Sequence, residues 1–357
     1  MAILLTNDQV CDLLSMEALI EAMETAYGEL AAGRGIYRVR SDMIAQTETP
    51  DEIFALKSMD GVVPRFGVGT IRINSDTLRY VRDGDRLRRD RVPSDDDGRY
   101  NGFVLVFSTR TGAVEMIYPD GAQSKRVASI TALGLRHVGK KTRGRVALIG
   151  TGVQARAQIE AANAVMEIER VRVYSTNAER REKFAGVMAQ RFGLDIRAAA
   201  SPEEAVAEAD VVLSATNSRN HTIFAKWLRP GMHVSCINMF ELEPEVVKTA
   251  DVVGTHIREC DPVFIKTAGM GILPEEPGAG FQNLAEETGF AEIPTIGDFI
   301  SGAAQGRTSD DQITCMVNSV GSGYQFAVLG HVLLTAARER GVGQEIPSEW
   351  FTATPER

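Results

Sequence analysis

Small residues at a strand-to-helix turn are the clearest chemical signal in this sequence. The apolar run 146–149 leads into Gly150, Gly152 and Ala155, and an alanine-rich helical pattern follows. Small residues at these positions permit a tight turn, close approach of backbone to a pyrophosphate, and close helix–strand packing. The N–H groups that open the helix favour phosphate. We therefore predict a dinucleotide site, with a glycine turn in an unliganded α/β domain as the alternative.

The end of the next strand bears on which dinucleotide is bound. It reads YSTN at 174–177, with Arg180 and Arg181 just behind it. A carboxylate here would bind the ribose 2′-hydroxyl of NAD, whereas hydroxyls, an amide and arginines suit a 2′-phosphate. The stretch contains no acid, which favours NADP(H). NAD(H) stays open, because both arginines could be ordinary exposed helix residues.

Several predicted elements position these residues. From residue 146, strands alternate with helices, which predicts right-handed crossovers and a parallel, Rossmann-type doubly wound sheet of the α/β class. Before it, residues 7–33 have the spacing of one amphipathic helix, and strands follow, including a hairpin over 102–118. The charged segment 75–101 is expected to leave the sheet, as a flap or a solvated loop. After residue 308 a long apolar helix is expected to return to the first domain.

Composition narrows the class of protein. The 357 residues are 44% hydrophobic and 24% charged, as in ordinary globular proteins, and the net charge of -9 argues against nucleic-acid or acidic-membrane binding. No signal peptide or membrane-spanning run is evident. Four scattered cysteines predict reduced thiols in a cytoplasmic protein. The histidines lack ligand spacing, so no metal site is expected.

Together, several segments resemble the ornithine cyclodeaminase/mu-crystallin family. They are VCDLLSMEALIEAMETAYGELAAG, VALIGTGVQARAQIEA, VVLSATNS, LRPGMHV and GRTSDDQITCMVNSVG, and they cover nearly the whole chain in order. The resemblance implies a mixed α+β substrate and dimerisation domain from residues 1–125 and 319–357, a dinucleotide domain from 126–318, and a homodimer. Family members include cyclodeaminases, ketimine and imine reductases, alanine dehydrogenases and an NADPH-binding crystallin.

The resemblance also implies roles for particular residues. An arginine after the first helix, Arg38 or else Arg40, would bind a substrate carboxylate together with Arg126, since a guanidinium grips a carboxylate through two parallel hydrogen bonds. The implied cofactor contacts are Gly150, Gly152, Val153, Gln154 and Ala155 in the turn, Ser175, Thr176 and Arg180 at the ribose, Thr216 beside the nicotinamide ribose, and Ser319, Val320 and Gly321 over the nicotinamide ring.

Two departures from the family pattern affect the chemistry. The family's lysine strand matches residues 67–69, which end in glycine, so Lys57 on the preceding strand is the candidate replacement. Where cyclodeaminases carry a proton-transferring aspartate, this chain has Phe240, which cannot transfer protons, followed by Glu241. Both departures weigh against strict ornithine cyclodeaminase activity.

The leading hypothesis is an NAD(P)-dependent imine reductase or amino-acid dehydrogenase acting on a small amino acid or its imine. Hydride would pass between nicotinamide and the substrate's α-carbon, and Lys57 or Glu241 would handle the proton. One alternative is a cyclodeaminase-like lyase that recycles NAD. The other is a crystallin-like protein that binds NADPH without turnover.

Overall fold

The computed structural model describes residues 1–353 except 84–85, 219, 259–261, 274–291 and 319–320. The chain forms two compact units. The first unit comprises Met1–Gln123, Cys260–Ala279 and Gly321–Arg357, and the second comprises Ser124–Glu259 and Gly280–Val320. The predicted boundaries placed 260–279 with the dinucleotide domain. Instead, β15 (Val263–Lys266) pairs in parallel with β3 (Ser41–Gln46) of the first unit.

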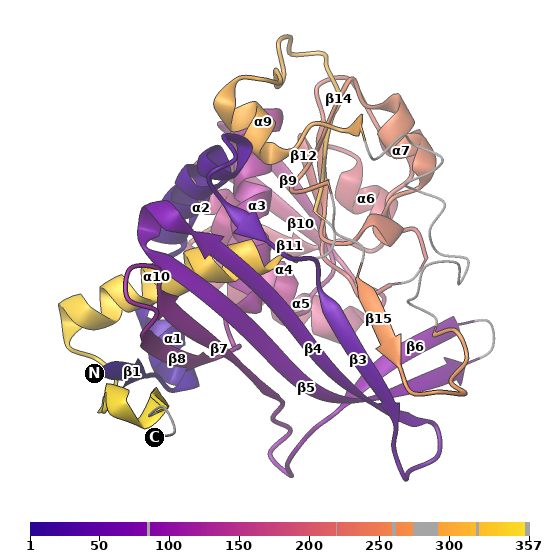
Figure 1. Cartoon of the computed structure of the whole chain (residues 1–357). Coiled ribbons are helices and arrows are strands. Elements are labelled where there is room, and N and C mark those ends of the chain that lie inside the picture. The colour runs from indigo at the N-terminus through magenta and orange to yellow at the C-terminus, as the bar shows by residue number, and fades with distance from the viewer. Residues whose placement is uncertain (84–85, 219, 259–261, 274–291, 319–320, 354–357) are drawn as a thin grey trace. The chain divides into compact units, whose positions relative to one another are not determined.

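The second unit is built on a parallel sheet (Figure 1). Its strands are β9 (Arg143–Ile149), β10 (Glu167–Tyr174), β11 (Ile196–Ala198), β12 (Val211–Ser214), β13 (His233–Cys236), β14 (Val252–Thr255) and β16 (Thr314–Val317). They are ordered β11-β10-β9-β12-β13-β16-β14. The chain therefore builds outward from β9 first in one direction and then in the other, which is the doubly wound Rossmann arrangement. The predicted fold class is confirmed.

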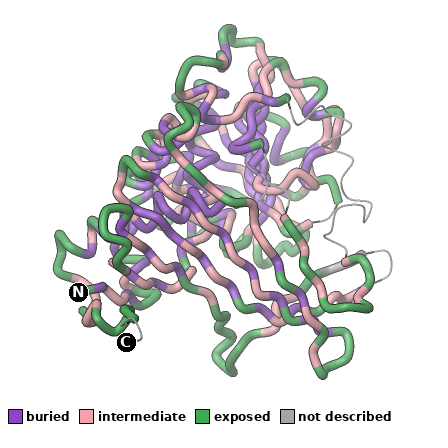
Figure 2. The backbone as a smooth tube through the Cα atoms, viewed as in Figure 1, coloured by how far each residue is buried: buried purple, intermediate pink, exposed green. Residues whose placement is uncertain are grey.

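The helices of this unit cover both faces of the sheet because β9 is apolar on both sides. Val146 and Leu148 lie in one hydrophobic cluster, and Ala147 and Ile149 lie in another. Figure 2 shows the strands of this sheet as largely buried, as expected for a parallel sheet with two covered faces. The helices are α3 (Gln123–Leu133, which begins in the first unit), α4 (Val153–Val165), α5 (Ala178–Phe192), α6 (Pro202–Val206), α7 (Pro244–Thr249) and α9 (Ile296–Ser301).

The first unit contains a mixed sheet packed against helices. Its order is β15-β3-β4-β5-β7-β8-β1-β17, with β2 on β4 and β6 on β5. The strands not yet given are β1 (Ala2–Leu4), β2 (Ile36–Tyr37), β4 (Glu52–Val63), β5 (Val68–Asp83), β6 (Arg86–Val92), β7 (Asn101–Ser108), β8 (Val114–Pro119) and β17 (Gln344–Ile346). Buried α10 (Gly323–Arg340) packs against β4, β5 and α2 (Met16–Ala31). Short helical turns are η1 (Pro64–Phe66), η2 (Gly134–Val138), η3 (Ala225–Trp227), η4 (Met239–Glu241) and η6 (Ser348–Phe351).

Three predicted elements are corrected. The single helix over 7–33 is two helices, α1 (Asn7–Leu13) and α2, because Thr6 and Ser15 each cap a separate start. The segment 75–101 does not leave the sheet at residue 75, since β5 continues to Asp83 and pairs with β6. The apolar stretch after 308 first forms β16, whose residues pair with β13 and β14, and only then α10.

Candidate functional site

A pocket of about 590 Å³ opens where β9, β10 and β12 end in the second unit. The chain runs from β9 to β10 and β11 on one side and then returns to β12 on the other side of β9. Such switch points in the strand order are where doubly wound sheets bind ligands. The structure brings together eight of the predicted cofactor residues as its lining: Gly150, Gly152, Val153, Gln154, Ser175, Thr176, Arg180 and Thr216. The geometry is that of a dinucleotide pocket.

The glycine turn forms the pocket floor for steric reasons. Gly150 has φ +115°, and a Cβ there would collide with the carbonyl oxygen of Ala215. Gly152 precedes α4, and a Cβ there would meet nothing within 4 Å. No side chain caps the first turn of α4, so its N–H groups are left for a ligand. Ala155 lies beneath the turn, fully buried in an apolar cluster, and does not line the pocket among its described residues.

Two arginines lie near the expected ribose end of the pocket: one lines the pocket, and the other contacts neighbouring residues of the protein. Arg180 is exposed and lines the pocket. Arg181 donates from Nη1 to the Ser175 carbonyl at 3.0 Å and lies over the Tyr174 ring. Asn177 caps α5 by accepting from the Arg180 backbone N–H at 2.8 Å. The described lining residues include no carboxylate.

Glu241 has a different task from the one predicted. The side chain is completely buried, and its carboxylate accepts five hydrogen bonds. Oε1 accepts from Ser214 Oγ at 2.8 Å and from the N–H and hydroxyl of Thr216 at 2.6 and 2.8 Å. Oε2 accepts from the N–H groups of Ile237 at 3.1 Å and Asn238 at 3.2 Å. Burial raises the pKa of Glu241, and these hydrogen bonds oppose the rise. The carboxylate therefore holds the pocket wall at Thr216 instead of facing a substrate.

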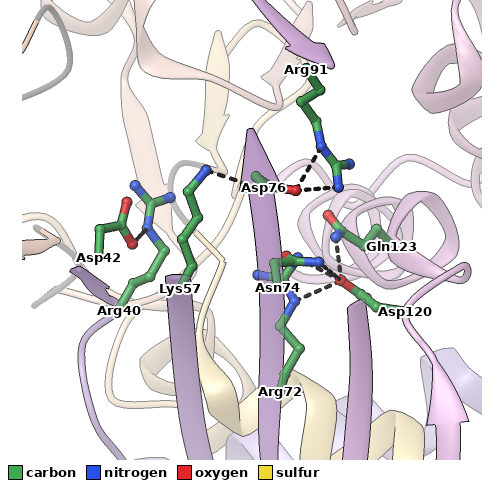
Figure 3. A network of polar contacts seen from close by, with 9 residues as sticks. All are labelled: Arg40, Asp42, Lys57, Arg72, Asn74, Asp76, Arg91, Asp120 and Gln123. Atoms are coloured by element: carbon green, nitrogen blue, oxygen red, sulfur yellow. Dashed lines mark hydrogen bonds and ion pairs between the residues drawn. The ribbon is translucent and has the colours of Figure 1, made fainter. Parts of the chain in front are cut away.

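The first unit contains a buried network of charged side chains on one face of its sheet (Figure 3). Asp42, Lys57 and Asn74 are direct neighbours across β3, β4 and β5, so they share a face. Arg72 and Asp76 share it as well, two residues to either side of Asn74. Charges removed from water require partners, and the network supplies them. We call the nine residues of Figure 3 the polar network: Arg40, Asp42, Lys57, Arg72, Asn74, Asp76, Arg91, Asp120 and Gln123.

Two anchors organise the polar network. Asp120, at the end of β8, accepts from Arg72 Nε at 2.6 Å, Gln123 Nε2 at 2.6 Å and Asn74 Nδ2 at 3.3 Å. Asp76 accepts from Lys57 Nζ at 3.2 Å. Burial and the neighbouring arginines lower the pKa of Lys57, and Asp76 and Asp42 oppose this. Lys57 is thus a buried amine at hydrogen-bond distance from the Asp76 carboxylate, with a pKa below the usual value for lysine.

The predicted arginines fall in different surroundings. The side chain of Arg38 is 62% exposed, and its Nη2 pairs with Asp60 at 2.7 Å, outside the polar network. Its alternative, Arg40, lies in the network, where its Nε donates to Asp42 at 2.8 Å. Arg126 lies in the second unit, near the start of α3, with its side chain buried. Among the candidates of the first unit, the structure brings Arg40 and Lys57 together and leaves Arg38 apart.

Sequence reasoning missed Arg72, Asp76, Arg91 and Asp120. The period-2 spacing of Arg72, Asn74 and Asp76 was the available signal, because alternate residues of a strand share a face. The expectation that segment 75–101 leaves the sheet obscured it. Ser319 and Val320 lie outside the described residues. Gly321 is grouped with the first unit, and its predicted contact with nicotinamide stays a prediction.

Known proteins match this architecture along its length. The model of the ornithine cyclodeaminase/mu-crystallin family matches residues 2–340, and the chain belongs to that family. A Δ1-pyrroline-2-carboxylate reductase of Bacillus cereus is 24% identical, over 97% of this chain and 99% of that protein. Other relatives are an alanine dehydrogenase of Archaeoglobus fulgidus and the ketimine reductase mu-crystallin of Rattus norvegicus. The family's described activities are thus those of reductases, dehydrogenases and cyclodeaminases.

Solved structures share the fold. The Thermococcus litoralis Δ1-pyrroline-2-carboxylate reductase, in complex with NADH and L-proline, has a TM-score of 0.76 at 21% identity and covers 96% of this chain and 100% of its own. An archaeal alanine dehydrogenase dimer with bound NAD has a TM-score of 0.75 at 22% identity, covering 97% and 99%. These likenesses show a shared fold along nearly the whole chain. In the described part of this chain, no helix is both long and apolar enough to span a bilayer.

Proposed function

We propose that this protein is an NADP(H)-dependent reductase of small imines that carry a carboxylate. The observation that supports this most is the pocket at the switch point, lined by the glycine turn and free of acidic side chains among its described residues. A dinucleotide bound there in its reduced form would supply a hydride to the imine carbon. The relatives named as reductases support the direction of the reaction.

The proposed preference for NADP(H) over NAD(H) rests on charge at the ribose. A 2′-phosphate needs cations and hydroxyl donors, and Arg180, Ser175 and Thr176 line that part of the pocket. An acid would repel the phosphate, and the described lining contains none. Because Arg181 is engaged with Ser175 and Tyr174, we assign the phosphate to Arg180.

The polar network supplies the groups for the substrate. We propose that Lys57 is the proton donor, since Glu241 is sealed from solvent and Phe240 cannot titrate. The Lys57 ammonium would give a proton to the imine nitrogen while the carbon accepts the hydride, which forms an amine and leaves a neutral lysine that regains its proton from water. Arg40, which immediately precedes β3 and belongs to the polar network, replaces Arg38 as the first-unit candidate for binding the carboxylate. The role predicted for Arg126 is kept.

The three candidate activities differ in whether they consume NADPH and in whether they release ammonia. With NADPH and Δ1-pyrroline-2-carboxylate or its six-membered homologue, we expect the absorbance of reduced nicotinamide to fall in proportion to amine formed. Arg40→Met should raise KM for the imine more than it lowers kcat, because it removes substrate binding. Ammonia release from ornithine without net absorbance change would instead indicate a cyclodeaminase. Tight NADPH binding with no turnover of imines, or of 2-oxo acids plus amines, would indicate a binding protein.

We also propose a homodimer. On the sheet face opposite the polar network, Met43, Phe54, Phe103 and Ile265 are 46, 36, 41 and 54% exposed. They lie on four different strands, and register places them on one side. An apolar patch of this kind favours a second copy of the chain as its cover.

Phe54→Asp should shift the mass measured by light scattering from dimer to monomer. Phe351→Asp, at another exposed phenylalanine, should leave it unchanged, and a monomeric parent protein would refute the proposal.

A further inference from the structure

Asp76 is held between two cations that come from different strands. Its Oδ2 accepts from Lys57 Nζ of β4 at 3.2 Å. Its Oδ1 accepts from Arg91 of β6, at 3.0 Å from Nε and 2.5 Å from Nη2. Figure 3 shows these contacts, with Arg91 approaching Asp76 from the side opposite Lys57. One carboxylate is therefore shared between the proposed proton donor and a second cation.

Strand register produces this arrangement. Lys57 pairs with Asn74, so Asp76 is the next residue on the same face of β5. Arg91 pairs with Leu78, one further step along that face. The Arg91 guanidinium also lies 4.2 Å from the centroid of the Tyr100 ring, which fixes its direction. The β5–β6 pairing thus delivers a cation to the far side of Asp76, and a shorter β5 without β6 would leave Asp76 to Lys57 alone.

We propose that Asp76 is a positioning residue that keeps Lys57 charged and directed, and that Arg91 limits how strongly it does so by competing for the same carboxylate. This inference rests on the proposed function, in which Lys57 donates the proton. An ammonium bound too tightly by an acid would donate its proton poorly. An ammonium with no acid nearby would already be deprotonated at the pH where the enzyme works. Sharing Asp76 with Arg91 places Lys57 between these limits.

The charges facing Lys57 come from three strands and from the residue that precedes one of them. Asp76 faces it from β5, Asp42 from β3, Arg40 from just before β3, and Arg89 from β6. Burial and the two arginines lower the pKa of Lys57, and the two aspartates raise it. Removing Asp76 takes away a stabilising charge, which lowers that pKa further. Removing Arg91 leaves Asp76 entirely to Lys57, which raises it.

The test uses two substitutions that should act in opposite directions. Because the protonated lysine is the active form, kcat falls as pH rises through the pKa of Lys57 in the bound complex. Asp76→Asn should lower the pH at which kcat falls by about 1 to 2 units. Arg91→Met should raise that pH by about 0.5 to 1 unit. The matched control is Arg79→Met on the same β5 strand, where the arginine pairs with Glu52 and is half exposed. This substitution should not change the pH at which kcat falls.

A purely structural role would lower kcat or stability without shifting the pH at which kcat falls in opposite directions. If this pH shifts in the same direction in both variants, or does not shift although the variants are folded, the inference is overturned. If no imine is turned over at all, the proposed function fails, and the inference is judged directly on the ligand-free protein. With lysine labelled with ¹³C at Cε and the Lys57 signal assigned through Lys57→Met, NMR titration should give Lys57 a lower pKa in D76N and a higher one in R91M. Unchanged values would overturn it.

Discussion

Replacing Glu241 with glutamine separates two roles that the same residue could play. In the structure, three backbone N–H groups and two hydroxyls donate to its carboxylate. A glutamine keeps one acceptor oxygen and turns an NH₂ group toward donors. The hydroxyls of Ser214 and Thr216 can rotate away, but the backbone N–H groups cannot. At least one and as many as two of them lose their acceptor.

The expected cost follows from the number of groups left unpaired. A buried N–H without an acceptor costs about 1 to 3 kcal/mol, so the loss of one or two acceptors in E241Q should lower the free energy of unfolding of the second unit by about 1 to 6 kcal/mol. Because Thr216 lines the pocket, the dissociation constant for NADPH should rise at least about tenfold, equivalent to about 1.4 kcal/mol. Glu245→Gln on α7 is the matched control, because Glu245 is exposed and forms an ion pair with nearby Lys248 at 2.8 Å.

The assay is urea unfolding in a Trp350→Phe background. Trp227 then reports the second unit alone, since the sequence has two tryptophans and Trp350 belongs to the first unit. NADPH affinity follows from its fluorescence. If E241Q unfolds within about 0.5 kcal/mol of the parent while kcat collapses, the anchoring role is refuted and the proton-transfer role is restored.

Three further outcomes are expected. Burial lowers the pKa of His233 to about 3, so the unfolded chain binds a proton that the folded chain does not bind as pH falls below about 6.5. Stability should therefore drop by about 3 kcal/mol from this residue by pH 4.5, and H233Q should remove that part of the slope in acid unfolding. Gly150→Ala should destabilise the ligand-free protein by more than about 1 kcal/mol, through its collision with Ala215. Gly152→Ala, with open space around it, should leave the melting temperature of the ligand-free protein unchanged yet weaken NADPH binding at least about tenfold. Equal effects of the two glycine substitutions on the melting temperature would contradict the pocket geometry. Arg180→Gln should raise KM for NADPH by about tenfold and leave KM for NADH unchanged; a parallel loss for both cofactors would show that Arg180 does not bind a 2′-phosphate.

Local chemistry was readable from the sequence. The tight turn at Gly150, the small residues that follow it, and the alternation of strands and helices depend on neighbours within a few residues, so they predicted the Rossmann-type unit and eight residues that line its pocket. The hairpin over 102–118 was predicted for the same reason and forms as β7 and β8.

Other features were decided by partners far away in the chain. The stretch 314–317 is apolar enough for a helix or a strand, and it becomes β16 because β13 and β14 flank it. Glu241 looked available for proton transfer, yet Ser214 and Thr216 from β12 and its loop bury and occupy it. Arg40 belongs to the polar network through its contact with Asp42, whereas Arg38 pairs with Asp60 outside it.

The residue types at each turn, cap and strand face were enough to predict the fold class and the family. Which charges meet depends on long-range strand pairing: Lys57, Asp76 and Arg91 come together because β4, β5 and β6 pair in one particular register. A shift of one residue would turn each side chain to the opposite face. Register and burial are set by the summed packing of distant segments, which short-range patterns do not encode.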